Sequence, residues 1–370
     1  MRIEEVELLQ VDLPLVRPFR TSFGTETIRQ ALVLLLRTDL GEGYGECVSG
    51  SEPLYSSEFV GSSWLTLCEC LVPRLLLAGD LTAASVATVL QEIKGHRMAK
   101  AALEMAVLDA ELRAAGQSLA SRLGAVTDRV TPGVSVGIPD SMPELLDIVG
   151  GYLDEGYTRV KLKIEPGWDV EAVAAVRDRF GADLMLQVDA NTAYSLSDLP
   201  RLRELDQFGL LLLEQPFDEE DLLSHVELAR QVTTPVCLDE TITSASLAIQ
   251  AISLGACSVV NIKAGRVGGY LEAVRVHDAC RQREIPVWCG GMLETGLGRA
   301  ANLALGALPG FVLPGDISAT DRYYKADITP PFVLEGGSIA VPAGPGLGVD
   351  IDVAVLSDLT SRRQVLTKSS

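Results

Sequence analysis

The chain has 370 residues, 47% of them hydrophobic, and its 31 basic and 50 acidic side chains give a formal net charge of −19. This hydrophobic content supports a full core and excludes a disordered chain. The acidic excess disfavours nucleic acids and anionic membrane surfaces as partners, because both require clustered lysine and arginine.

An α+β capping domain is predicted for residues 1–125, completed by about residues 326–370. Three short strand patterns predict a small antiparallel sheet; they span residues 3–12, 31–37 and 43–48. A long helical pattern follows from about His96 to Leu123. A further strand at Phe332–Leu334 is expected to return to the first sheet. We expect this domain to cover the open mouth of a barrel.

Two segments among these elements, residues 17–25 and 49–57, are predicted to be loops. One interpretation is a pair of mobile lids that exclude water and set specificity. The alternative is that both are ordinary connections. The lid interpretation assigns four residues of the first segment to the lid: Phe19, Thr21, Ser22 and Phe23.

A barrel is predicted for residues 126–325, where short β-branched runs alternate with helix-length segments. The eight strand-like runs are residues 133–137, 159–164, 184–189, 209–214, 235–239, 258–263, 286–289 and 311–316. Regular alternation predicts parallel strands joined by crossover helices. Eight such units close into a (β/α)8-type barrel with the helices outside.

Polar residues or glycine end these runs at intervals of 24 to 27 residues; they are Lys163, Asp189, Glu214, Asp239, Lys263, Gly290 and Asp316. The carboxyl ends of barrel strands form the active-site face, so these side chains are expected to converge on one axis. The alternative is that the acidic residues cap helices or begin loops.

Three of these carboxylates, Asp189, Glu214 and Asp239, end successive strands and predict a metal site. Hard divalent cations such as Mg²⁺ prefer oxygen ligands. Zinc is disfavoured, because the three histidines (His96, His225 and His277) fall in predicted helices. In an alternative interpretation one carboxylate is an acid or base and the others are structural. Glu240 either supports the metal ligands or begins the next loop.

Lysines are the predicted acid and base. Strict alternation over Val160–Ile164 places Lys161 and Lys163 on one inward face of their strand. Asn261 and Lys263 point inward from the strand opposite, so Lys163 and Lys263 are expected to flank a bound substrate. The alternative is that the lysines only form salt bridges with the three carboxylates.

Proton abstraction from a carbon next to a carboxylate requires a lysine with a lowered pKa. The ammonium of Lys161 and a nearby divalent cation would both lower the pKa of Lys163. The metal would neutralise the negative charge that develops on the enediolate. Arg266 either lowers the pKa of Lys263 in the same way or is a surface residue.

The ordered motifs of the chain resemble the enolase superfamily, muconate-lactonising-like subgroup; they are Lys161-x-Lys163, Asp189-x-Asn191, Glu214-Gln-Pro, Asp239-Glu240 and Lys263. The sequence around Val188, Trp288 and Pro314 is similar to that of the branch of o-succinylbenzoate synthases and N-acylamino acid (N-succinylamino acid) racemases. The resemblance covers essentially the whole chain. It implies a modified (β/α)7β barrel and a homo-oligomer.

The resemblance also implies the roles of individual residues. Asp189, Glu214 and Asp239 would hold the metal, Mg²⁺ first, with Mn²⁺ or Co²⁺ possible, and Lys163 and Lys263 would be the acid/base pair. Residues expected to border a small carboxylate substrate are Ser135, Lys161, Asn191, Gly291, Met292 and Ser318, to which the inward position of Asn261 adds one more.

Two reactions follow from the resemblance, and they share one enediolate. The first is racemisation of N-acylamino acids by two bases; the second is the syn dehydration that forms o-succinylbenzoate. The alternatives are a dedicated o-succinylbenzoate synthase of menaquinone biosynthesis and another cycloisomerase or epimerase of the subgroup. Asp316-Ile317-Ser318 departs from the D-x-D of dipeptide epimerases, which argues against a free-amine substrate. A hypothesis of a different class is a metal-free, non-catalytic binding scaffold.

The compartment is predicted from cysteine usage and from the N-terminus. The seven cysteines are scattered, and we expect them to be reduced. The charged start Met1-Arg-Ile-Glu-Glu does not resemble a secretory signal, and the apolar runs are too short to span a bilayer. These features predict a cytoplasmic protein.

Overall fold

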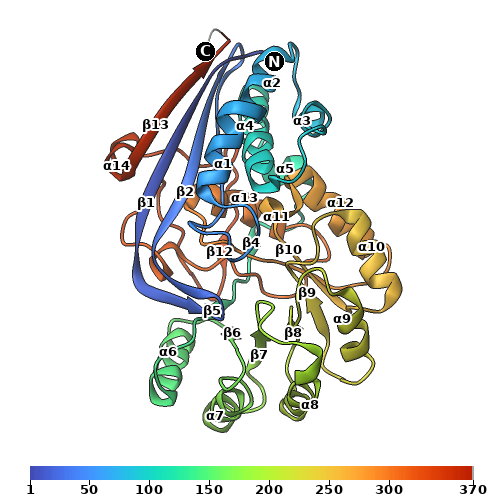
Figure 1. The fold of residues 1–370 in the computed structure, drawn as a ribbon. Helices are drawn as coiled ribbons and strands as arrows, with labels where there is room; N and C mark the ends of the chain where they lie inside the picture. The colour runs from blue at the N-terminus through green and yellow to red at the C-terminus, as the bar shows by residue number, and fades with distance from the viewer. Residues whose placement is uncertain (369–370) are drawn as a thin grey trace.

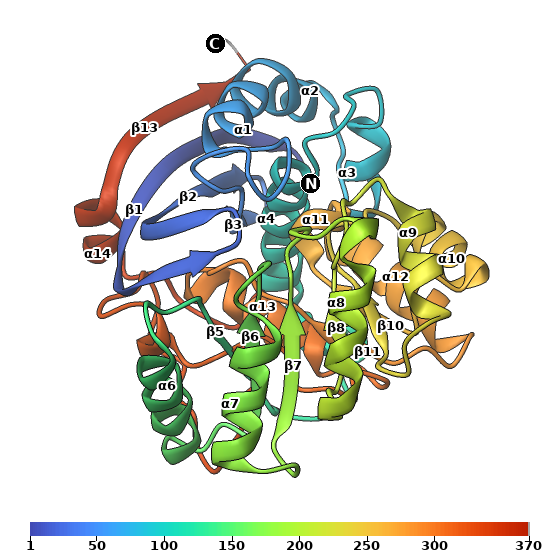
Figure 2. The same cartoon turned by 60° about the horizontal axis from the view of Figure 1, so that its bottom comes forward.

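The computed structural model describes residues 1–368. A four-stranded antiparallel sheet with helices lies above a curled, seven-stranded parallel sheet (Figures 1 and 2). The antiparallel sheet has the order β13-β1-β2-β3; its strands are β1 (Ile3–Thr21), β2 (Gly24–Thr38), β3 (Gly41–Cys47) and β13 (Thr360–Thr367). Apolar side chains of β1 and β2 are buried, without alternation over residues 31–36 of β2.

The segment predicted as a loop at residues 17–25 is a β-hairpin. Pairing between β1 and β2 continues to Thr21 opposite Gly24, so only Ser22 and Phe23 form the turn. The register of the hairpin shifts between Pro14 and Phe19, where prolines 14 and 18 lack an N–H for the ladder. The prediction of a loop was therefore wrong for most of this segment.

Two other local predictions need correction. The helical pattern at 96–123 is broken into α4 (Arg97–Ala115) and α5 (Leu119–Leu123), because Gly116 takes the left-handed conformation at φ 64°. Residues 332–334 do not form a strand; two prolines precede them and cannot donate to a ladder. The chain returns to the first sheet through β13 instead, which pairs with β1.

The remaining helices of this region form one continuous stretch from Val60 to Leu77, followed by α3 (Ala83–Val89); the stretch comprises α1 (Val60–Thr66), the π-helical η1 (Leu67–Leu71) and α2 (Val72–Leu77). Within residues 1–368 it is the one helical stretch long and apolar enough to cross a membrane. It contacts β1, β2 and β13, and Leu67 and Leu71 are fully buried. Packing against the sheet therefore accounts for the apolar residues on its buried face.

The parallel sheet follows the chain order; its strands are β5 (Val134–Val136), β6 (Arg159–Lys163), β7 (Met185–Asp189), β8 (Leu213–Glu214), β9 (Val236–Leu238), β10 (Val259–Ile262) and β11 (Val287–Cys289). Helices between and after the strands are α6 (Met142–Asp154), α7 (Val170–Phe180), α8 (Leu199–Arg203), α9 (Leu222–Ala229), α10 (Ala245–Leu254), α11 (Ala264–Val267), α12 (Tyr270–Arg281) and α13 (Gly296–Gly306). The short elements are η2 (Leu196–Asp198), η3 (Glu204–Phe208), η4 (Thr320–Arg322), β4 (Arg129–Val130), β12 (Ile339–Ala340) and α14 (Val353–Leu359). Figure 2 shows α6, α7 and α8 on the outside of the curled sheet.

The barrel closes without a regular eighth strand. Residues 311–316 make isolated parallel bridges instead, from Phe311 to Val287 of β11 and from Gly315 to Pro132, just before β5. Pro314 cannot donate a ladder hydrogen bond, which interrupts the pairing. The predicted barrel with an α+β cap is confirmed, and its eighth strand-like run, 311–316, forms isolated bridges instead of a continuous strand.

Buried carboxylates of the cap join it to helices of the barrel. Glu46 of β3 accepts hydrogen bonds from the backbone N–H of Thr295 (2.9 Å) and of Gly298 (2.9 Å), at the start of α13. Glu104 of α4 accepts from the N–H of Leu271 (3.0 Å), in the first turn of α12. Such carboxylates satisfy helix N-termini and interact with the helix dipole.

Glu46 is expected to make stability depend on pH. Burial raises its pKa from 4.5 to about 7, so between these values the folded state binds more protons than the unfolded chain. Its stability contribution is therefore present below about pH 4.5 and is lost as pH rises through about 7, by about 3 kcal/mol in all. Urea unfolding of the wild type and of Glu46→Gln from about pH 5 to 8 measures this difference. A difference that stays constant over the range would contradict the assignment.

Candidate active site

Three buried carboxylates meet at the carboxyl ends of neighbouring strands. Asp189 ends β7, Glu214 ends β8, and Asp239 follows β9 directly. One ligand oxygen from each lies within 4.8 Å of the others. Strands that run parallel and in sequence order present their ends on one side of the sheet, which is why residues 25 positions apart converge here.

The carboxylates of this group interact with one another and with the neighbouring lysines. Burial raises the pKa of Glu214, and the neighbouring Asp189 raises it further. Burial would also raise the pKa of Asp189, but the ammonium groups of Lys163 and Lys161 outweigh it and hold that pKa low. Hard oxygen donors brought together at this spacing fit a divalent ion.

Lys163 and Lys263 lie at opposite ends of the carboxylate group. The Lys163 ammonium donates to Asp189 Oδ2 (2.6 Å), and the Lys263 ammonium donates to Asp239 Oδ2 (2.7 Å). Lys163 belongs to β6, and Lys263 follows β10, so the three strands between them carry the carboxylates. Both lysines line the same pocket. The structure therefore places both lysines around one space.

The two lysines differ in electrostatic environment. Burial lowers the pKa of Lys163, and the neighbouring Lys161 lowers it further, against the opposite effect of Asp189. Burial acts on Lys263 in the same direction, but Tyr55 and Glu240 outweigh it and raise the pKa of Lys263. The pKa values of the two lysines are therefore shifted in opposite directions.

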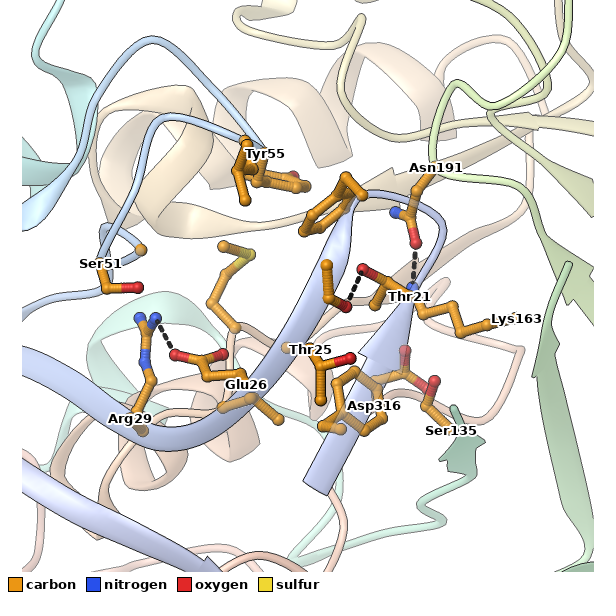
Figure 3. A pocket seen from close by; sticks show the side chains of 18 of the residues that line it. Thr21, Thr25, Glu26, Arg29, Ser51, Tyr55, Ser135, Lys163, Asn191 and Asp316 are labelled. Atoms are coloured by element: carbon orange, nitrogen blue, oxygen red, sulfur yellow. Dashed lines mark hydrogen bonds and ion pairs between the residues drawn. The ribbon is translucent and has the colours of Figure 1, made fainter. Parts of the chain in front are cut away.

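The pocket between the lysines has a volume of about 180 Å³ and opens to solvent. Figure 3 shows Lys163, Asn191 and Ser135 on one side, and Glu26, Arg29 and Ser51 on the other. The cap supplies the wall facing the barrel, through the hairpin turn after Thr21 and the segment at 49–57. Its apolar lining suits the carbon framework of a substrate; it includes Phe19, Phe23, Leu54, Met292, Leu293 and Tyr323.

Most of the predicted substrate-bordering residues line this pocket; they are Ser135, Lys161, Asn191, Gly291 and Met292. Asn261 and Ser318 are not among the lining residues. Asn261 is buried and donates to Glu214 Oε1 (2.7 Å), and the backbone carbonyl of Ser318 accepts from Arg299. Of the four predicted lid residues, Phe19, Thr21 and Phe23 line the pocket, while the Ser22 hydroxyl donates to the Ala190 carbonyl (3.1 Å).

Glu240 and Arg266 are both buried beside this group. Glu240 accepts from Asn191 (2.9 Å), whose amide oxygen accepts from Lys163 (2.5 Å), and burial raises the pKa of Glu240 to about 7. Arg266 forms an ion pair with Asp239 and donates to the Asn261 carbonyl (2.5 Å). The alternative that placed Arg266 on the surface was wrong.

Sequence reasoning missed two contacts of the site. The Tyr55 hydroxyl donates to Asp239 Oδ1 (3.0 Å) and accepts from Lys263 (3.3 Å). Asp316 accepts from Arg159 (2.7 Å) and forms an ion pair with Lys161 (2.6 Å). The regular spacing of strand-end residues already included Asp316, but no local pattern distinguishes Tyr55 from the rest of its loop.

Gly290 makes room for Lys263, so Gly290→Ala is expected to lower kcat about tenfold or more. A Cβ at this position would lie closest to Asn261 Oδ1, and 2.7 Å from both Asn261 Nδ2 and Lys263 Cε, so Asn261 and Lys263 would both have to move. Turnover of the purified variant measures the effect. Gly151→Ala in α6 is the matched control, because nothing lies within 4 Å of its Cβ and alanine favours the helix. Equal activity of both variants would contradict this role of Gly290.

Comparisons with known proteins identify the family of the chain. Residues 3–124 match the family "Mandelate racemase / muconate lactonizing enzyme, N-terminal domain", and residues 144–355 match "Enolase C-terminal domain-like". The chain is 63% identical over 363 residues to an N-succinylamino acid racemase of Amycolatopsis sp., covering 98% of this chain and 99% of that relative. It is 45% identical over 354 residues to an o-succinylbenzoate synthase of Geobacillus kaustophilus, covering 95% and 94%.

A solved structure is similar over its whole length. The crystal structure of an enolase superfamily member from Listeria innocua superposes with a TM-score of 0.95 at 40% sequence identity, covering 100% of both chains. Both the cap and the barrel are therefore shared with that protein.

Proposed function

The chain belongs to the enolase superfamily, and on that premise we propose that it racemises N-succinylamino acids and also forms o-succinylbenzoate by syn dehydration. One observation carries the proposal: Lys163 and Lys263 line a single pocket from opposite ends of the Asp189–Glu214–Asp239 group. The relative at 63% identity is named for the first reaction, and the relative at 45% for the second.

In racemisation, the lysines move protons at the α-carbon of the substrate. Lys163, with its lowered pKa, takes the α-proton as the C–H bond breaks, and its electron pair passes into the substrate carboxylate. Asp189, Glu214 and Asp239 would hold a divalent ion, which would neutralise the negative charge that develops on the substrate carboxylate. Lys263, held protonated, returns a proton to the opposite face. The other enantiomer uses the two lysines in reverse.

In dehydration, a single lysine is sufficient. Lys163 takes the α-proton and then delivers it to the departing hydroxyl group on the same face, so that water leaves and a double bond forms. Lys263 remains a cation beside the ring of the substrate. The opposite pKa shifts of the two lysines favour this reaction as a second candidate, because only Lys163 is shifted toward a base.

Two assays on one preparation test the proposal. Polarimetry follows the racemisation of an N-succinylamino acid, and ultraviolet absorbance follows the dehydration. We expect turnover in both assays. We also expect Lys263→Arg, which keeps the positive charge but cannot readily transfer a proton, to lower the rate of racemisation much more than the rate of dehydration. Dehydration without any racemisation would contradict the proposed racemase activity and would identify a dedicated o-succinylbenzoate synthase. Absence of turnover in both assays would contradict the whole proposal.

Several finer assignments belong to the same proposal. Mg²⁺ is the proposed ion, with Mn²⁺ or Co²⁺ as alternatives, and its support is a donor set made of carboxylates alone. The substrate is a small carboxylate. A cytoplasmic location is supported by seven free cysteines, and a homo-oligomer by the family resemblance. The domain boundaries at about 125 and 325 are proposed on the pairing of β13 with β1.

A further inference from the structure

The ammonium of Lys161 is bound by three carboxylates. Its Nζ lies 3.1 Å from Asp189 Oδ2, 3.1 Å from Glu214 Oε2 and 2.6 Å from Asp316 Oδ2. The contact with Glu214 is a hydrogen bond, and the contacts with Asp189 and Asp316 are ion pairs. The side chain of Lys161 is almost completely buried, which excludes water as a competing partner for most of its surface.

Asp316 differs from the other two acceptors. It lies on the segment that closes the barrel between β11 and β5, outside the group that would hold the ion. Its other oxygen accepts from Arg159 (2.7 Å), a fully buried residue that also donates to the Pro314 carbonyl (2.6 Å). Asp316 is therefore fixed in place from the side opposite Lys161.

An aromatic ring gives Lys161 a second contact on this side. The Lys161 ammonium lies 4.9 Å from the centre of the Trp288 ring, and the Arg159 guanidinium lies 5.4 Å from the same ring. The Lys161 ammonium therefore has a second binding site that does not involve the ion-binding carboxylates. This site consists of Asp316, Arg159 and Trp288.

This second binding site matters because Lys161 and a divalent cation compete for the same oxygens of Asp189 and Glu214. An ammonium held on Asp189 and Glu214 would occupy two of the three carboxylates and would repel the incoming ion. We propose that Asp316 is a positioning residue that holds Lys161 when the divalent ion binds, so that the affinity for the ion depends on Asp316. The inference rests on the proposed function only for the presence of an ion at Asp189, Glu214 and Asp239.

Asp316→Asn tests the proposal, with Mn²⁺ as the probe and its binding followed by electron paramagnetic resonance without substrate. We expect affinity to fall about tenfold, the usual scale for a residue that supports metal ligands. Asp109→Asn is the matched control, since Asp109 is a buried carboxylate paired with an arginine in the cap, and it should bind Mn²⁺ like the wild type.

A double variant separates competition by Lys161 from general damage. In the background of Lys161→Gln, which removes the competing charge, Asp316→Asn should change Mn²⁺ affinity by less than about twofold. A loss that persists in the double variant, or wild-type affinity in Asp316→Asn itself, would overturn the proposal. Because no substrate is present, these outcomes do not depend on whether the protein is a racemase.

A crystal structure of the wild type provides a second test, which does not depend on whether Asp316→Asn folds. In a crystal of the wild type with Mg²⁺ bound, Lys161 Nζ should remain within hydrogen-bond distance of Asp316 and leave Asp189 and Glu214. An ammonium that leaves Asp316 and stays on Glu214 would overturn the inference.

Discussion

Replacing either Lys163 or Lys263 with alanine is expected to lower kcat for racemisation about a thousandfold, with a much smaller change in KM. Each lysine is needed in both directions of a two-base reaction, as acid for one enantiomer and as base for the other. Loss of a positioned acid or base costs about 10²- to 10⁴-fold. Both ammonium groups lie within 2.7 Å of a carboxylate at the ends of the group, so neither can replace the other. Initial rates by polarimetry measure the effect.

The matched control for these variants is Lys94→Ala, because Lys94 is exposed and does not line the pocket. It should retain wild-type kcat, and circular dichroism should show that all three variants are folded. Racemisation at the wild-type rate by Lys163→Ala or Lys263→Ala would remove that lysine from the mechanism.

Removing the charge of Glu214 is expected to lower kcat for racemisation about as much as the loss of either lysine. Glu214 lies on the central strand of the three that carry the carboxylates, and Glu214→Gln replaces a charged ligand by a neutral amide. We expect divalent-ion affinity to fall about a hundredfold and kcat about a thousandfold. Calorimetric titration with Mn²⁺ measures the first quantity, and polarimetry measures the second. Exhaustive removal of divalent ions from the wild type should abolish turnover, and added Mg²⁺ should restore it.

Glu104→Gln is the control for this variant. Glu104 is also a buried carboxylate, but it binds the start of α12 and is not one of the three ion-binding carboxylates. Its substitution should leave ion affinity unchanged. Wild-type Mn²⁺ affinity in Glu214→Gln, or full turnover after removal of divalent ions, would contradict the metal assignment.

The strands and strand-end residues could be predicted because their pattern is local. Alternation along Val160–Ile164 fixes which side chains share a face, and parallel strands in sequence order bring residues about 25 positions apart to one edge. Asp189, Glu214 and Asp239 therefore follow from spacing alone.

Contacts between distant segments could not be predicted in this way. Tyr55 reaches Asp239 across 184 positions, and Glu46 reaches Thr295 across 249. The hairpin at residues 17–25 was missed because the prolines in β1 hid its strand pattern. The closing segment at 311–316 was assigned as a strand from its apolar residues, although Pro314 prevents a continuous ladder.

The central claim is that two lysines reach the α-carbon from opposite faces, and proton exchange in heavy water tests it most directly. Each enantiomer of an N-succinylamino acid is incubated with enzyme in D₂O, and loss of the α-proton signal is followed by NMR. We predict that the wild type exchanges both enantiomers, that Lys163→Ala exchanges only one, and that Lys263→Ala exchanges only the other. Exchange of the same enantiomer by both variants, or of neither enantiomer by the wild type, would contradict the account.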